Sequence, residues 1–297
     1  MNFRTDLAVE CHEYATKKHC EGVDIEKHRA GKVKVTTITV HNREGSRQLG
    51  KPVGRYITLE IPTLTKNAQL FTDSLETLSC QIKALLPEEG TVLVAGLGNG
   101  KITPDALGPR CVSLLLATRH ISDELAKSVG LGKLRSVAAL VPGVLGQTGI
   151  ESAEIIKGTV KSISPSAVIV VDALAARSVS RLGCTVQLTD TGVSPGSGVG
   201  NARKEISKKT LGVPVIAIGV PTVVDTSTMI FDILEKSGMN PMDIIGESKN
   251  EDSITMVTPK EVDNMIDRAA KLVAMGINCA LQPDISPEDI MEIVATP

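Results

Sequence analysis

The segment TVLVAGLGNGKITPDALGPR, residues 91–110, contains the unit that decides the fold. It opens with an apolar run, 91–95, that has the length of a strand and no alternation of polar and apolar positions. Such a run is typical of a strand buried on both faces of a parallel sheet. A glycine-rich loop follows, and Pro109 is a residue type favoured in the first turn of a helix. The segment therefore predicts a strand, a loop and a helix in that order.

The same order recurs through the rest of the chain. Further apolar runs predict strands at residues 136–141, 167–171, 184–188 and 213–218. Helices are predicted at residues 110–127, 151–162, 222–237 and 259–275. Strands that alternate with helices indicate an α/β fold with helices on both faces of the sheet. We therefore expect a three-layer sandwich with a mostly parallel, twisted sheet.

The residues before this region have a different pattern. Residues 32–40 and 55–61 alternate apolar and polar positions and are rich in β-branched side chains, which predicts an added β-ribbon. Residues 69–86 carry one apolar stripe at helical spacing. Residues 1–30 are polar and weakly patterned, so we expect them to be loosely attached, with one short helix at 8–15.

The composition excludes several classes of function. The net charge is −2 and Lys and Arg are dispersed, so no basic surface for nucleic acid is expected. The aromatic content of 2% is too low for a base-stacking platform. No apolar stretch reaches the roughly 20 residues that span a bilayer. The six cysteines have no Cys-x-x-Cys spacing, and reduced thiols in a cytoplasmic protein are expected.

Two aspartates follow the predicted strands at the positions where α/β sheets place their chemistry. Ligands gather beyond the carboxyl ends of the strands in such sheets. Asp105 lies in the loop after the strand at 91–95, and Asp172 directly follows the strand at 167–171. Asp105 also fits an ordinary helix cap, and Asp172 also fits an ion pair with Arg177. Spacing alone leaves both alternatives open.

Other catalytic and binding motifs fit the sequence poorly. The loop at 96–101 lacks the first glycine and the final Ser or Thr of a P-loop, and Lys101 stands where a dinucleotide fingerprint needs its third glycine. Its glycines then make a tight turn. No Gly-x-Ser-x-Gly elbow and no His-Glu-x-x-His cluster occur, and four of the five histidines precede residue 42. Gln147, in another glycine-rich loop, is a candidate hydrogen-bond donor to a substrate carbonyl.

Five motifs together resemble the germination endopeptidase family of spore-forming bacteria. They are GLGNGKITPDALGPR (96–110), GQTGIES (146–152), VIVVDALAARS (168–178), DTGVSPGSGVGNARKE (190–205) and AIGVPTVVD (217–225). They occur in the family's order, and the resemblance covers nearly the whole chain.

The resemblance implies an atypical aspartic endopeptidase that begins the degradation of small acid-soluble spore proteins during germination. Its two proposed catalytic aspartates fall on Asp105 and Asp172. The implied fold is similar to that of the hydrogenase maturation proteases. The implied protein is a self-processing zymogen and a homotetramer in the spore core, without a cofactor, a bound metal, nucleic acid or membrane contact. The alternative is a metal-dependent hydrolase of the maturation-protease type.

The resemblance also implies a site of self-cleavage. Family substrates are cut between an acid and a bulky apolar residue, in sequences like Thr-Glu-Phe/Ile-Ala-Ser-Glu. This chain has Thr5-Asp6-Leu7-Ala8-Val9-Glu10, so the cut is expected between Asp6 and Leu7. Residues 1–6 are then a candidate propeptide, and residues 7–297 a single α/β peptidase domain.

The expected mechanism uses two carboxylates that share one proton. Like charge raises one pKa, so that one group acts as a base toward water and the other as an acid. Asp105 and Asp172 meet if their strands are neighbours. Candidate residues for contacting the substrate and its oxyanion are Gly96, Gly98, Asn99 and Gln147.

Overall fold

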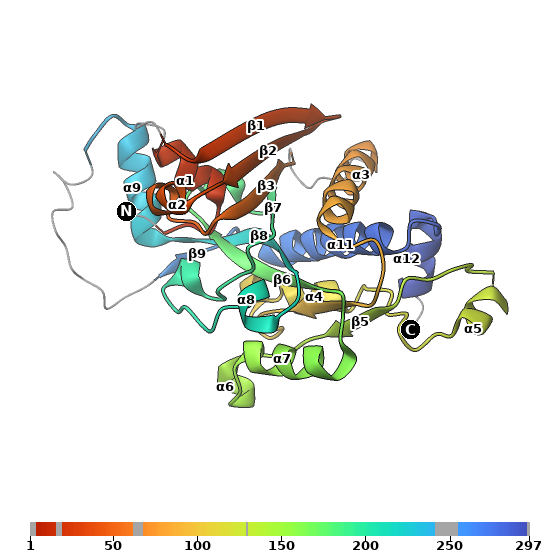
Figure 1. Cartoon of the computed structure of the whole chain (residues 1–297). Coiled ribbons are helices and arrows are strands. Elements are labelled where there is room, and N and C mark those ends of the chain that lie inside the picture. Colours follow the sequence, from red (N-terminus) through yellow and green to blue (C-terminus); the bar gives the residue numbers. More distant parts are fainter. Residues whose placement is uncertain (1–3, 16–19, 62–67, 129, 241–254, 296–297) are drawn as a thin grey trace.

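The computed structural model describes residues 4–15, 20–61, 68–128, 130–240 and 255–295, which are built around one mixed β-sheet (Figure 1). The strands of these residues are β1 (Val23–Ala30), β2 (Val33–Val40), β3 (Gly54–Glu60), β4 (Val92–Gly96), β5 (Val137–Leu140), β6 (Ala167–Ala176), β7 (Thr185–Thr189), β8 (Val215–Asp225) and β9 (Met256–Val257). Their order across the sheet is β1-β2-β3-β7-β8-β6-β4-β5, and β9 pairs with β8.

Helices cover both faces of this sheet. They are α1 (Ala8–Ala15), α2 (Arg43–Leu49), α3 (Ala68–Leu85), α4 (Leu107–Val112), α5 (Asp123–Ser128), α6 (Leu145–Thr148), α7 (Ser152–Ile163), α8 (Lys208–Leu211), α9 (Thr226–Lys236), α11 (Val262–Leu281) and α12 (Pro287–Ala295). Short 3₁₀ turns are η1 (Thr103–Asp105), η2 (Val179–Arg181) and η3 (Ser197–Val199). The predicted α/β fold class is confirmed, but the sheet is mixed and only partly parallel, not mostly parallel.

The strands β5, β4, β6 and β8 form the parallel half of the sheet. β4 pairs in parallel with both β5 and β6, and β6 pairs in parallel with β8. Their apolar runs are buried because helices lie over both faces. This half matches the strands expected from the apolar runs.

The strands β1, β2, β3 and β7 form the antiparallel half. The expected ribbon is not a separate appendage, because β3 pairs antiparallel with β7 and β7 with β8, which makes one continuous sheet. The run at 184–188 therefore forms an antiparallel strand, not a parallel one. Its apolar composition reflects burial of both faces, and burial does not set strand direction.

The expectation of a loosely attached N-terminal segment is wrong. Residues 23–30 form β1, which is mostly solvent-facing and therefore lacks an apolar pattern; pairing with β2 defines it. The helix expected at 8–15 is present as α1, and Leu7, Ala8 and Val9 are buried against the sheet.

Three predicted helices have clearly different bounds, and the one expected at 259–275 is α11, which begins at Val262 and continues to Leu281. The segment 110–127 contains α4 and α5, with irregular chain between them, because the Asn278 side chain accepts from Leu116 N and donates to Leu114 O, each at 3.0 Å. These bonds replace helical ones. The helix expected from 222 begins at Thr226, because β8 runs on to Asp225, whose carboxylate accepts from Thr228 N at 2.9 Å.

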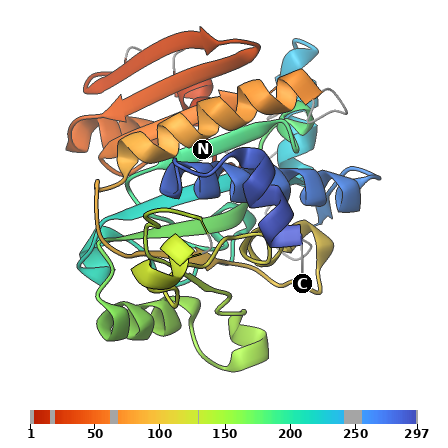
Figure 2. The same cartoon turned by 90° about the vertical axis from the view of Figure 1, so that its right-hand side faces the viewer.

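The core lies in three clusters that leave a gap on one face. α3, α4, α11 and α12 pack over the first face, where α3 and α11 lie side by side (Figure 2). The second face carries one cluster under α7 and α8 and another under α1 and α2. Along β6, Val168 and Val170 belong to the cluster under α7 and α8. Leu174 and Ala176 belong to the cluster under α1 and α2. Asp172 lies between them.

Candidate active site

Asp172 lies at the point where β6 loses one neighbouring strand. The expectation that it ends its strand is wrong, because β6 continues to Ala176 alongside β8. β4 ends at Gly96, which pairs with Val171. The condition for the two acids to meet is fulfilled, since β4 and β6 are direct neighbours. From Asp172 onward, the β4 side of β6 has no β4 residue opposite it.

Asp105 lies in η1, above the end of β4. Its Oδ2 accepts from Asn99 N at 2.7 Å. The alternative role as a helix cap is wrong, because Ala106 precedes α4 at the cap position and no side chain caps it. A Cβ atom added at Gly98 would lie 2.0 Å from the Asp105 carbonyl oxygen, so only glycine permits this close approach. Burial raises the pKa of Asp105, and the Asn99 amide opposes that rise.

Asp172 is buried, with 7% of its surface exposed. Its Oδ1 accepts from Ala173 N at 2.9 Å. Burial raises the pKa of Asp172 well above its usual range, and the nearby carboxylates of Asp105 and Asp6 raise it further. The alternative ion pair with Arg177 is not supported, because Arg177 pairs with Asp232 and Glu235 on α9.

The N-terminal segment lies against the extended end of β6, residues 172–176. Asp6 N donates to Ala175 O at 2.9 Å, and Ala175 N donates to Asp6 Oδ2 at 2.9 Å. Val171 O accepts from Leu97 N of the chain following β4, and backbone groups alternate in direction along a strand. Asp6 therefore occupies the side of β6 that β4 has left.

The Asp6 carboxylate has a fitted surrounding. Ser197 Oγ donates to Asp6 Oδ1 at 3.1 Å. A Cβ atom added at Gly198 would lie 2.1 Å from Asp6 Oδ2. This carboxylate thus fills space that only a glycine leaves open.

The bond between Asp6 and Leu7 has polar contacts on its acyl side and a buried apolar residue on its amine side. The Asp6 carbonyl accepts from Lys51 Nζ at 2.9 Å and from Gln187 Nε2 at 3.0 Å. Leu7 is fully buried. The sequence analysis missed Lys51 and Gln187. A polar residue inside the apolar run 184–188 was the one available signal for Gln187.

Three acids, Asp6, Asp105 and Asp172, line a common cavity of about 500 Å³. Gly98 and Asn99 also line it, together with residues of the glycine-rich loop around η3. Gln147 Nε2 donates to Asn99 Oδ1 at 2.8 Å and is itself exposed. Gly96 packs against α4, since an added Cβ atom would lie 2.2 Å from Gly108 O. The structure thus places Gly98 and Asn99 in the cavity with the acids. Gly96 and Gln147 do not line this cavity; Gly96 contacts α4 and Gln147 contacts Asn99.

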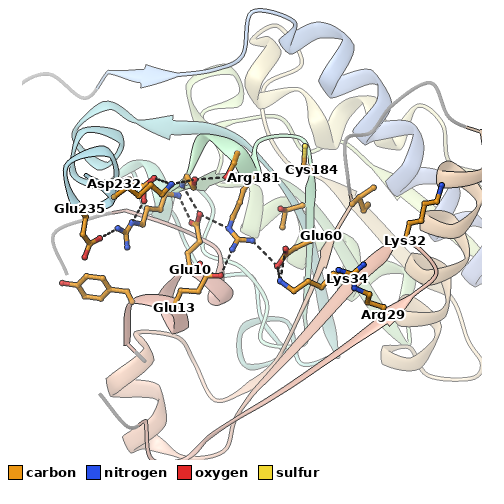
Figure 3. Close-up of a pocket in the computed structure, with 17 residues that line it drawn as sticks. Glu10, Glu13, Arg29, Lys32, Lys34, Glu60, Arg181, Cys184, Asp232 and Glu235 are labelled. Atoms are coloured by element: carbon orange, nitrogen blue, oxygen red, sulfur yellow. Dashed lines mark hydrogen bonds and ion pairs between the residues drawn. The ribbon is translucent and has the colours of Figure 1, made fainter. Parts of the chain in front are cut away.

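A charged network anchors α1 next to this site (Figure 3). The Glu10 carboxylate accepts from the backbone N–H groups of Arg177 at 2.7 Å and Ser178 at 3.0 Å. Arg181 lies between Glu10, Glu13 and Glu60, at 3.4, 2.7 and 3.5 Å. Burial raises the pKa of Glu10, and these hydrogen bonds and Arg181 oppose that rise.

The described residues lack the features of a metal centre or a membrane span. Within the described ranges, no group of three or more His, Cys, Asp or Glu side chains is arranged to hold a metal ion. None of the helices described here is long and apolar enough to cross a membrane. All six cysteines lie in described segments, and none forms a disulfide.

The chain has an α/β fold in which an extended segment and two carboxylates line one cavity, as the site of an α/β peptidase requires. A family model described as germination protease matches residues 4–237, and the chain belongs to this endopeptidase family. It is 42% identical to a germination protease of Clostridium acetobutylicum, over 98% of each chain. It is 36% identical to that of Priestia megaterium, over 96% of this chain and 95% of the relative.

A solved structure also overlaps with part of the chain. It is the NiFe hydrogenase maturation protease HycI of Thermococcus kodakarensis. The TM-score is 0.37 and the identity 18%, over 66% of this chain and 98% of that one.

Proposed function

We propose that this chain is an endopeptidase in which Asp105 and Asp172 act together on water. Its substrates are its own Asp6–Leu7 bond and the small acid-soluble proteins of the spore, which it begins to degrade during germination. It cleaves after an acidic residue and before a bulky apolar one. Its full length is a zymogen, with residues 1–6 as the propeptide.

One observation carries this proposal. The acid of the expected cleavage site, Asp6, lines the same cavity as Asp105 and Asp172, although the three residues are far apart in sequence. Its carboxylate is close enough to raise the pKa of Asp172. This position supports cleavage of the segment by the protein's own carboxylates.

The pair of carboxylates supplies both proton transfers of a peptide hydrolysis. At the pH where the pair holds one proton, the ionised group takes a proton from water, and the water oxygen bonds to the peptide carbon. The other group gives its proton to the leaving nitrogen as the C–N bond breaks. Because the pair titrates as a unit, these roles belong to the pair.

The contacts of Asp6 and Leu7 support the proposed specificity. An acid before the cut is held by Ala175 N and by Ser197 Oγ. The apolar residue after the cut is fully buried. Spore-core location and a homotetramer remain proposals that follow from the family resemblance, and gel filtration with light scattering tests the second.

The test is incubation of the purified chain with a small acid-soluble spore protein, followed by mass spectrometry of the products. We expect cuts between an acid and a bulky apolar residue, and loss of the first six residues from the enzyme. Intact substrate and intact enzyme after prolonged incubation would refute the proposal.

A metal-dependent mechanism is the alternative. We expect activity to persist after exhaustive treatment with a chelator, followed by removal of the chelator. Lost activity that returns on adding a transition-metal ion would favour the alternative. The absence of a cofactor stays a prediction until that measurement is made.

A further inference from the structure

Two side chains converge on the carbonyl oxygen of Asp6. Lys51 Nζ donates to it at 2.9 Å and Gln187 Nε2 at 3.0 Å. The same Gln187 amide accepts from Ala8 N through Oε1 at 2.7 Å. The Gln187 side chain therefore bridges the Asp6–Leu7 peptide bond, with one contact on each side of it.

The register of the sheet places Gln187 of β7 and Asp172 of β6 in one row, on either side of β8. Gln187 pairs with Gly219 of β8, and Gly219 pairs with Asp172 of β6. Residues in one such row point to the same face of a sheet. Gly219 carries no side chain, and Leu174 packs over it, since an added Cβ atom would lie 2.5 Å from Leu174 Cγ. Both Gln187 and Asp172 are buried. The row therefore places the Gln187 amide and the Asp172 carboxylate on the same face of the sheet.

A cavity of about 580 Å³ joins these groups. It is lined by Asp6, Lys51, Asp172 and Gln187. Lys51 comes from the chain between α2 and β3, and Gln187 comes from β7, so both donors belong to the antiparallel half. The carboxylates come from the parallel half. The peptide segment lies between the two halves.

We propose that Lys51 and Gln187 form the oxyanion site for cleavage of the Asp6–Leu7 bond. When the water oxygen bonds to the Asp6 carbonyl carbon, the carbonyl oxygen gains the negative charge, and a cationic and a neutral donor already face it. The charge returns to the carbonyl as the C–N bond breaks and the Leu7 nitrogen takes a proton from the carboxylate pair. Asn99 N, a donor expected from the 96–100 loop, is bonded to Asp105 instead.

This inference rests on the proposed self-cleavage and is tested by the rate of that reaction in the full chain. Intact-mass spectrometry follows loss of residues 1–6 in wild type, Lys51→Met, Lys51→Arg, Gln187→Leu and Lys157→Met. We expect about a 10²-fold slower reaction in Lys51→Met and in Gln187→Leu. We expect Lys51→Arg to stay within about tenfold of wild type, because it keeps a cationic donor. Lys157 lies exposed on α7 and is the matched control.

A second measurement separates catalysis from anchoring. Hydrogen exchange at the Asp6 and Ala8 amides, in an Asp172→Asn background that keeps the segment intact, reports whether the segment stays docked. Slow cleavage with unchanged protection of both amides in Lys51→Met supports the oxyanion role. Protection that falls as much as the cleavage rate overturns it.

The remaining outcomes are distinguishable. Wild-type rates in both Lys51→Met and Gln187→Leu overturn the oxyanion site and leave the proposed function standing. A wild-type chain that never loses residues 1–6 refutes the proposed self-cleavage itself.

Discussion

The parallel and antiparallel halves of the sheet contribute different groups to the same cavity. The parallel half supplies the two carboxylates, Asp105 after β4 and Asp172 in β6. The antiparallel half supplies Gln187 in β7 and, next to β3, Lys51; both contact the Asp6 carbonyl. Figure 1 shows the two halves as one continuous sheet, and they meet where β7 pairs with β8.

If the proposed function holds, the two halves have separable duties. The parallel half holds groups whose raised pKa values suit proton transfer. The antiparallel half holds two donors to the Asp6 carbonyl, and the peptide segment itself is bonded to β6 of the parallel half. Changes in the parallel half should therefore affect the chemistry, and changes in the antiparallel half should affect the position and polarisation of the peptide.

The largest effect is expected from Asp105→Asn and Asp172→Asn. Each removes one proton-transfer group, so self-cleavage and substrate cleavage should both fall about 10³-fold or more. Rates are measured by mass spectrometry, with Asp284→Asn, an exposed aspartate after α11, as the control. Near-normal rates in both variants would remove the parallel half from the chemistry.

The next effect is expected from Gly198→Ala. Its Cβ atom would lie 2.1 Å from Asp6 Oδ2 and would displace the Asp6 side chain. Self-cleavage should slow by about 10²-fold, because misplacing a reacting group by about 1 Å has that effect. Gly158→Ala on α7 is the matched control, since no atom lies within 4 Å of its added Cβ. Equal rates in the two variants would show that the Asp6 pocket does not position the bond.

A pH-dependent effect on stability is expected from Asp172. The pKa of Asp172 is raised in the folded protein, so the folded state holds a proton that the unfolded chain releases. The contribution of Asp172 to the free energy of unfolding therefore falls as the pH rises from about 3.8, the ordinary pKa, through the folded pKa. Asp172→Asn removes this dependence. Urea unfolding from about pH 4 to about pH 8 should show the variant gaining stability relative to wild type. A difference that is constant with pH would contradict the pKa shift.

The smallest effect is expected from Glu10→Gln, which weakens the anchor of α1. The variant loses the ion pair with Arg181 and the charge on an acceptor of two backbone N–H groups. We expect a loss of about 1–2 kcal/mol in the free energy of unfolding, measured with urea. Glu13 pairs with the same arginine, but the Glu13 side chain is exposed. Glu13→Gln should therefore lower the free energy of unfolding by less than about 1 kcal/mol. A larger cost for Glu13→Gln would reverse this ranking.

The sequence by itself determined the parallel half and its acids. Apolar runs without alternation predict strands covered on both faces, and ligand groups collect beyond their ends, which made Asp105 and Asp172 candidates. The family motifs around them were needed to favour these two aspartates over helix capping and an ion pair. The family motifs lie mainly in this half. These signals are local, because each strand and its following loop are adjacent in the chain.

Only the tertiary structure decided which distant residues meet those acids. Asp6 reaches Ala175, and Lys51 and Gln187 reach the Asp6 carbonyl, through strand order and register. Strand β1 went unpredicted because an exposed strand lacks an apolar pattern. Periodicity records which face a residue occupies, but it does not record which strand lies next to it. Pairing across the sheet therefore decided how the peptide segment is held.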